Sequence, residues 1–123
     1  MQRKTCLTML AFAGLLAGTS AYAAGAYDGT YRGPLTTTES MARTCHGAAS
    51  VSRVVRDNTL TYLWANAQVS FPVAADGTIS GQRSLGGRGK GQVTVHGQID
   101  GDVLTLDSEG TGCGFHFVGH KIH

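Results

Sequence analysis

The feature that most constrains the fold is the spacing of apolar side chains, which recur at every second position and stop at short turn-forming pairs. Leu60, Tyr62 and Trp64, for example, fall on one face of an extended segment. A period of two is the pattern of a β-strand with one buried face. The intervening pairs tolerate the positive φ angles of tight hairpins, so consecutive strands are expected to be antiparallel. These pairs are Asp57-Asn58, Asp76-Gly77 and Asp100-Gly101.

The alternation predicts about eight short strands and no helix of normal length. The expected strands cover residues 27–35, 49–56, 59–64, 67–73, 78–84, 92–99, 103–107 and 112–120. An open sheet of this size would leave long unprotected edges, so an all-β small antiparallel barrel or a two-layer sandwich is predicted. A short turn is expected within residues 38–44, which lack alternation.

The N-terminal segment has the three parts of a signal peptide. Arg3 and Lys4 precede an apolar run over residues 6–16, and Ala21-Tyr22-Ala23 offers small residues at a cleavage site. We predict cleavage after Ala23, with residues 1–23 as the signal peptide and 24–123 as a single antiparallel β-domain. The apolar run is shorter than the ~20 residues that span a bilayer, so no integral membrane segment is expected after processing. The predicted location is periplasmic or secreted.

Two cysteines remain after this cleavage, because Cys6 leaves with the signal peptide. Export leads to an oxidising compartment, in which Cys45 and Cys113 have only each other as partners. The predicted disulfide closes a long loop, and the chain-entropy model values such a crosslink at ~4 kcal/mol.

The charge balance argues against nucleic acid as a partner. The chain has ten Lys and Arg residues and eight Asp and Glu residues, and the signal peptide removes Arg3 and Lys4. The remaining domain is neutral when histidine is uncharged. Proteins that bind nucleic acid do so largely by neutralising phosphates, so no nucleic acid partner is predicted.

The most unusual segment of the domain, residues 82–91, combines glycines with three cations. Arg83, Arg88 and Lys90 are predicted to form a loop that contacts an anionic ligand or the carboxylates of a partner protein. A phosphate-binding P-loop is excluded because Lys90 is followed by Gly91 and not by Ser or Thr. The simpler interpretation is a flexible hairpin tip whose charges maintain solubility.

Five histidines invite a search for a metal site. His116 and His120 share one face of a strand, but residues four apart on a straight strand are separated by about 13 Å. Metal–nitrogen bonds are about 2 Å long, so these two side chains cannot share one ion. His46, His96 and His123 add no cluster of defined spacing. We therefore predict no metal site and no cofactor.

No set of catalytic residues is recognisable. The chain lacks the Gly-x-Ser-x-Gly motif of hydrolases, and both remaining cysteines are expected to be oxidised. Three of the eight carboxylates lie in predicted turns, where they have a structural role. No catalytic residue is predicted, and the chain is not expected to be an enzyme. Tyr62 and Trp64 are expected to pack in the core, the alternative being an exposed platform for a sugar or a partner protein.

Several turn and cysteine motifs resemble small secreted proteins that are common in proteobacteria and mostly uncharacterised. The likeness rests on an opening Tyr27-Asp28-Gly29-Thr30, a cysteine about a dozen residues later, and a closing Gly112-Cys113-Gly114-Phe115. It covers most of the mature chain. The resemblance implies the β-fold and the disulfide, and it implies no activity.

These observations favour an exported binding or interaction module without catalysis, whose partner is an unknown protein or an anionic ligand. One alternative is an inhibitor of a secreted hydrolase such as lysozyme or a protease, because small exported disulfide-closed barrels resemble such inhibitors in architecture. Ser80-Gly81-Gln82-Arg83 resembles the Ser-Gly-containing loop of lysozyme inhibitors, whereas their Lys-Gly-containing motif is not evident. Another alternative is a metal-binding or enzymatic domain that uses the histidines.

Overall fold

The computed structural model describes residues 25–41, 45–86 and 91–123, so the predicted signal peptide, residues 1–23, lies outside the described residues. The described chain is all-β, as the alternation predicted, and contains eight strands and no helix. The strands are β1 (Gly29–Ser40), β2 (Ala48–Arg56), β3 (Thr59–Trp64), β4 (Ala67–Pro72), β5 (Thr78–Ser84), β6 (Gln92–Asp100), β7 (Val103–Gly110) and β8 (Cys113–Ile122).

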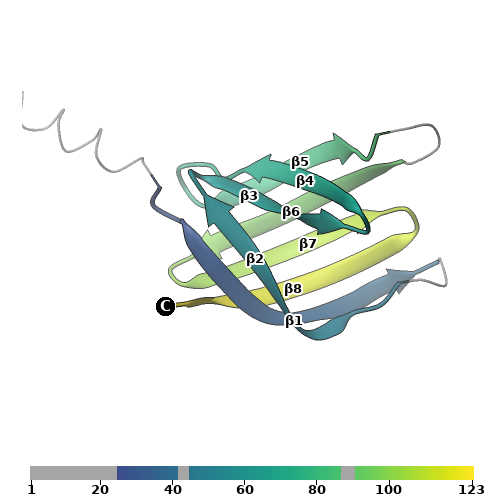
Figure 1. The fold of residues 1–123 in the computed structure, drawn as a ribbon, viewed down its shortest axis with the longest axis horizontal. Helices are drawn as coiled ribbons and strands as arrows, with labels where there is room; N and C mark the ends of the chain where they lie inside the picture. The colour runs from purple at the N-terminus through teal and green to yellow at the C-terminus, as the bar shows by residue number, and fades with distance from the viewer. Residues whose placement is uncertain (1–24, 42–44, 87–90) are drawn as a thin grey trace, which may run out of the picture.

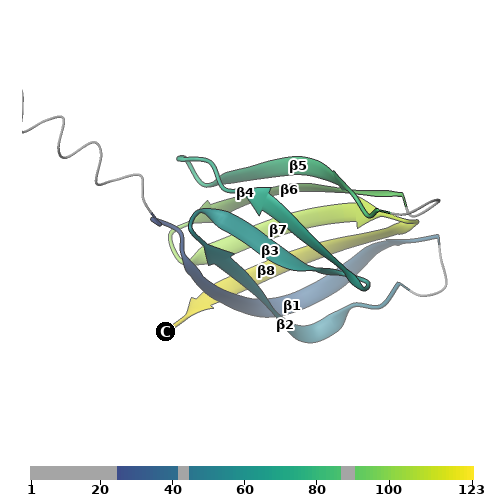
Figure 2. The same cartoon turned by 45° about the horizontal axis from the view of Figure 1, so that its top comes forward.

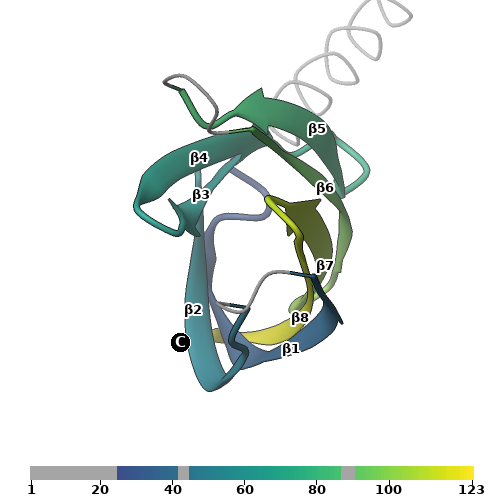
Figure 3. The same ribbon diagram turned by 90° about the vertical axis from the view of Figure 1, so that its right-hand side faces the viewer.

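All eight strands belong to one antiparallel sheet, in the order β4-β3-β2-β1-β8-β7-β6-β5. The sheet curls until its two edge strands, β4 and β5, approach each other (Figures 1 and 2). Seen from one end, the strands surround a common interior, which identifies a nearly closed barrel and not a sandwich (Figure 3). Among the described residues, no helix is long and apolar enough to cross a membrane.

The first strand is longer than predicted. Residues 38–40 were expected in a turn, but they continue β1, where Ser40 pairs with Cys113 and Glu39 with Gly114. The turn prediction is therefore wrong for these residues, and residues 42–44 lie outside the described part of the chain. The polar run of threonines hid the strand, because its alternation is not visible in hydrophobicity, although threonine favours extended backbone.

The core fills the barrel with the inward side chains of every strand. Tyr31, Leu60, Phe71, Ile79, Val93 and Leu104 are fully buried. Tyr62 and Trp64 are buried with them, which confirms their predicted place in the core. A buried apolar side chain of this size stabilises a fold by roughly 1.5–3 kcal/mol relative to exposure. The barrel interior is thus the one continuous core of the described domain.

The hairpin turns match the predicted chemistry. Asp57 and Asn58 have φ angles of 53° and 58°, and Gly77 and Gly101 also have positive φ. The carboxylate of Asp28 accepts hydrogen bonds from the backbone amides of Asp57 (2.9 Å) and Asn58 (3.2 Å). Asp28 therefore links the residue before β1 to the β2–β3 turn through hydrogen bonds.

The junction between the edge strands β4 and β5, here called the seam, completes the barrel with few contacts. One backbone bridge, between Val73 and Ile79, lies next to the turn that joins the two strands. Further along, Arg83 Nε of β5 donates to the Ser70 carbonyl of β4 at 2.9 Å. The same guanidinium lies 5.0 Å from the centre of the Phe71 ring, a cation–π contact. A side chain thus takes the place of a backbone ladder.

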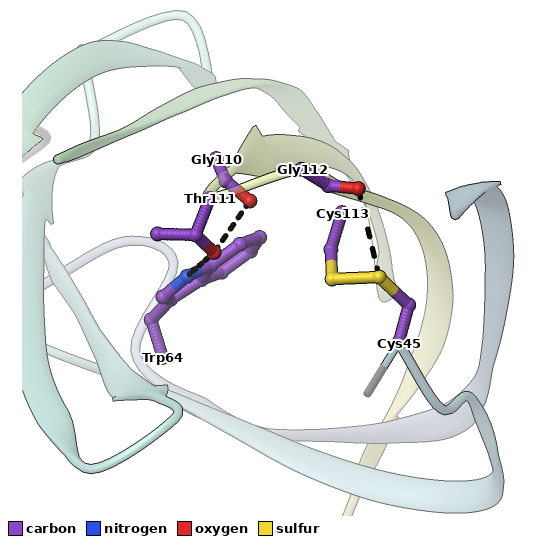
Figure 4. The surroundings of a disulfide bond; sticks show 6 residues. All are labelled: Cys45, Trp64, Gly110, Thr111, Gly112 and Cys113. Atoms are coloured by element: carbon purple, nitrogen blue, oxygen red, sulfur yellow. Dashed lines mark hydrogen bonds between the residues drawn. A yellow bond between two sulfur atoms is a disulfide. The ribbon is translucent and has the colours of Figure 1, made fainter. Parts of the chain in front are cut away.

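The predicted disulfide is present. Cys45 and Cys113 are bonded, with Cα atoms 5.6 Å apart and a sequence separation of 68 residues. The bond joins the segment before β2 to the first residue of β8 (Figure 4). We call this part of the barrel the disulfide end. Four of the strand connections lie there, namely β1–β2, β3–β4, β5–β6 and β7–β8.

Candidate ligand site at the disulfide end of the barrel

A cavity of about 270 Å³ opens at the disulfide end and reaches into the barrel interior. Figure 3 looks at the molecule from this end. The lining comes from both halves of the sheet and from the segment that carries Cys45. It consists of Leu35, His46, Arg53, Tyr62, Leu63, Trp64, Ala65, Ser108, Thr111, Cys113 and Phe115.

Aromatic side chains form one wall of this cavity. The indole of Trp64 is 6% exposed, and its Nε1 donates to Thr111 Oγ1 at 3.3 Å. The ring lies edge-on to Phe115, with centroids 5.6 Å apart and planes at 72°. Thr111 Oγ1 in turn donates to the Gly110 carbonyl at 2.7 Å. This short chain of hydrogen bonds, visible in Figure 4, fixes the tryptophan at the mouth.

The disulfide forms another part of the rim. Cys113 lines the cavity, and Figure 4 places the disulfide across the barrel opening from the indole. The Cys45 sulfur lies 3.6 Å from the Gly112 carbonyl oxygen. A disulfide sulfur has no hydrogen to donate, so this approach is a packing contact and not a hydrogen bond. The crosslink therefore holds the segment that carries His46 beside the opening.

One cation lies inside the barrel. Arg53 occupies an inward position of β2, between Val51 and Val55, and its guanidinium lies 4.5 Å from the Tyr62 ring centre. The Phe117 ring centre is 5.4 Å away. Because a guanidinium above an aromatic face is attracted to the π-electrons, these rings hold the charge within the apolar interior.

This cation has no counter-ion among the described residues. The two ion pairs there, His116–Asp107 and His123–Asp102, involve no arginine. Arg53 Nη1 donates to the Ser52 carbonyl at 3.2 Å, whereas the buried Nε has no hydrogen-bond partner. Burial lowers the pKa of this guanidinium, yet arginine remains protonated in proteins.

A second polar group in the cavity is also unsatisfied. The Tyr62 hydroxyl is buried, and the Ser108 hydroxyl lies near it but outside the geometry of a hydrogen bond. Burial raises the pKa of this phenol, and the nearby Ser108 hydroxyl and the Arg53 charge oppose the rise. The phenol therefore stays a neutral donor at physiological pH. Buried polar groups without partners are uncommon in native proteins, so each one calls for an explanation.

The volume limits what could fill the cavity. An apolar cavity of about 150 Å³ accommodates benzene, and pockets for drug-sized ligands start at about 300 Å³. The observed 270 Å³ lies between these values. A molecule of one or two rings, or a short acyl chain, fits this space together with a small polar group.

Of the three cations predicted to bind an anion, only Arg83 lies among the described residues. Arg83 is committed to the seam through Ser70 and Phe71, as described above. Arg88 and Lys90 lie outside the described residues. Ser80-Gly81-Gln82-Arg83, predicted to resemble an inhibitory loop, is part of β5 and pairs with His96–Val93 of β6. The structure therefore puts this segment in a strand.

The histidines lie mostly on the outer face. His116 Nδ1 donates to Asp107 Oδ1 at 2.6 Å, and antiparallel register places His96 on the other side of this carboxylate. Within the described chain, no group of three His, Cys, Asp or Glu side chains could hold a metal ion. The sequence analysis missed the His116–Asp107 pair because cross-strand neighbours depend on register, which spacing alone does not give.

Arg53 was not predicted as a site residue, although the alternation of its strand contains a signal for it. Val51, Arg53 and Val55 alternate with exposed residues, so the arginine shares the apolar face of its strand. A charged residue on the buried face of a strand marks either a paired ion or a binding site. The cations of residues 82–91 gave a stronger signal than Arg53 did, because they lie close together in the sequence.

Comparison with family models, with curated proteins and with solved structures gave no match. The candidate site is therefore defined by its own geometry.

Proposed function

We propose that the protein is an exported binding module that holds a small organic ligand in the cavity at the disulfide end of its barrel. The observation that carries this proposal is a 270 Å³ cavity with aromatic walls and a lining arginine, Arg53, that has no counter-ion among the described residues. Ligand sites combine this kind of apolar lining with a few orienting polar groups. The rigid sheet and the disulfide supply a preformed site, which lowers the entropic cost of binding.

A titration followed by NMR tests the proposal. The indole N–H signal of Trp64 is a specific reporter, because the chain contains a single tryptophan and its ring lines the cavity. We expect one- and two-ring acids, amides and alcohols to include compounds that shift this signal saturably, together with the Ser108 and Thr111 amides. Shifts confined to the outer face, or no saturable shift across such a panel, would contradict the proposal.

A matched pair of variants separates cavity binding from surface binding. Ser108 is 6% exposed and lines the cavity, whereas Ser80 is exposed on β5. We expect Ser108→Leu to fill the cavity and abolish the titration, and Ser80→Leu to leave it unchanged. Near-ultraviolet circular dichroism of both variants verifies that they remain folded. Equal binding by both variants would place the ligand elsewhere.

Export remains part of the proposal. The predicted signal peptide motivates it, and a disulfide is compatible with an oxidising compartment. Expression of the full chain in a Gram-negative host tests this, with a mature N-terminus at Ala24 and a disulfide-bonded periplasmic or extracellular product expected. Retention of the intact chain in the cytoplasm would refute it.

Inhibition of a secreted hydrolase stays a prediction from sequence. A panel of lysozymes and proteases, assayed with micromolar protein, tests it directly. Because Ser80-Gly81-Gln82-Arg83 is part of a strand, no described feature favours this function over ligand binding.

A further inference from the structure

We infer that the ligand is a small organic monocarboxylate whose carboxylate pairs with Arg53 and whose apolar body lies against Trp64 and Phe115. This inference rests on the proposed ligand site and specifies the chemistry of its occupant. It follows from three properties of the cavity, namely its charge, the hydrogen-bonding capacity of Arg53 and its size.

The charge of the cavity is positive and uncompensated. Arg53 lines it, and neither described ion pair supplies a carboxylate to this residue. Among the described lining residues there is no Asp or Glu, and the only other side chain that can carry a positive charge is the exposed His46. Arg53 is partly buried, and a charge removed from water is destabilised unless it is paired, so an anion gains more than a neutral molecule by entering.

The free donors of Arg53 suit a carboxylate. Nη1 donates to the Ser52 carbonyl, whereas Nε is fully covered and makes no hydrogen bond to a described residue. The terminal edge of the planar guanidinium, formed by Nη1 and Nη2, can donate two parallel hydrogen bonds to a carboxylate.

The size and the single cation together favour a monoanion. One guanidinium neutralises one charge, so a phosphate monoester would bring a second charge into a low-dielectric interior without a partner. The lining also contains the apolar side chains of Trp64, Phe115 and Leu35, against which an apolar body can pack. A cavity of 270 Å³ accepts a body of one or two rings.

Three probes with the same naphthyl body test this inference: 2-naphthoate, its neutral isostere 2-naphthamide, and the larger 2-naphthyl phosphate. Affinities are measured from the Trp64 indole signal, on protein purified after export of the full chain. We expect naphthoate to bind about 10-fold or more tightly than naphthamide, which is the scale of a charge-assisted pair. Naphthyl phosphate is expected to bind more weakly than naphthoate.

Variants of Arg53 and of a control arginine on β2 test whether Arg53 causes the difference in affinity between naphthoate and naphthamide. Arg53→Gln is expected to reduce naphthoate affinity to that of naphthamide and to leave naphthamide binding unchanged. Arg53→Lys retains the charge without the two-pronged edge and should give an intermediate value. Arg56→Gln, an exposed position on the same strand, is the control and should bind as the wild type does.

The outcomes separate the inference from the proposed function. Equal binding of naphthoate and naphthamide by the wild type, or tighter binding of the phosphate, overturns the monocarboxylate while the ligand site stands. Absence of binding by all three probes, and by the wider panel, overturns both. If Arg53→Gln is poorly folded, the comparison of naphthoate with naphthamide binding by the wild type still tests the inference. Naphthoate binding must also weaken as pH falls through the pKa of the carboxyl group of the probe.

Discussion

Arg83 illustrates how one side chain can replace part of a backbone ladder. Its Nε donates to the Ser70 carbonyl, and its guanidinium covers the Phe71 ring, so it joins the two edge strands where backbone pairing ends. Arg83, which was predicted from sequence to contact an anionic ligand, therefore has a structural role at the seam. Its hydrogen bond and its cation–π contact each contribute on the order of 1 kcal/mol.

Arg83→Met is predicted to lower the free energy of unfolding by about 1 kcal/mol, because the seam loses a charged donor while the aliphatic length of the side chain is kept. Urea denaturation followed by Trp64 fluorescence measures the change. Arg56→Met, at an exposed position on β2, is the control and should stay within about 0.5 kcal/mol of the wild type. Equal losses in the two variants would contradict the role of Arg83 at the seam.

Asp28 gives a prediction for the pH dependence of stability. Hydrogen bonds from the Asp57 and Asn58 backbone amides lower the pKa of this carboxyl below its ordinary value of 3.8. A lowered folded-state pKa means that the stabilisation is complete above 3.8 and disappears as pH falls through the folded-state value.

We therefore expect Asp28→Asn to reduce the urea midpoint at pH 7, and the gap from the wild type to narrow below pH 3.8. Urea unfolding at a series of pH values measures this gap. Asp100→Asn, whose carboxylate makes no hydrogen bond to a backbone amide of the described residues, controls for the loss of one aspartate. A gap that widens on acidification would refute the prediction.

At the scale of elements, Gly33 marks a close approach between β1 and β8. Gly33 lies in β1 beside an irregularity in its pairing with β2, where Pro34 lacks an amide hydrogen for the ladder. A Cβ atom at Gly33 would collide with the Val118 carbonyl of β8. Glycine is required here for lack of space and not for an unusual backbone angle.

Gly33→Ala is accordingly predicted to destabilise the fold by about 3 kcal/mol. Gly101→Ala, in a turn with φ of 62° and open space around the added methyl group, should cost only about 1 kcal/mol. Thermal unfolding of the two variants compares a steric clash with a conformational cost. The reverse order would show that β1 and β8 can separate freely.

The crosslink between Cys45 and Cys113 acts on both stability and site shape. Replacing both cysteines with alanine is predicted to reduce stability by about 4 kcal/mol, since the bond closes a loop of 68 residues. Because Cys113 lines the cavity, the same variant should also bind ligand more weakly. Chemical reduction of the wild type should reproduce both effects, and a loss below about 1 kcal/mol would contradict this account.

Sequence alone could predict strands but not their neighbours. Alternation at Leu60, Tyr62 and Trp64 identified a strand with a buried face, and two cysteines allowed only one crosslink. Closure of the sheet depends on contacts between β4 and β5, which no local pattern encodes. The candidate site depends on the same long-range arrangement, because Arg53 and Phe115 come from strands far apart in sequence. The one local signal for the candidate site in the sequence was the charged Arg53 on an otherwise apolar face of its strand.

For the whole molecule, the seam predicts where the barrel opens first. The edges of β4 and β5 share a single backbone bridge, whereas β1, β7 and β8 are paired on both sides. Amide hydrogen exchange is therefore expected to be fast along residues 67–70 and 81–84, at the unpaired edge groups, and slowest in the three central strands. Uniform protection around the barrel would indicate a closed ladder.

The positions of the chain ends and of the seam also indicate that the order of the strands along the chain can be changed by circular permutation. The first and last strands lie side by side, with Thr30 opposite Ile122, while the turn at residues 74–77 crosses only the weakly held seam. A short linker from His123 to Gly25, with new ends created between residues 74 and 77, would give a circular permutant that keeps every continuous strand pairing. Such a protein should fold with its binding cavity intact, because the rearranged connections lie at the opposite end from the mouth.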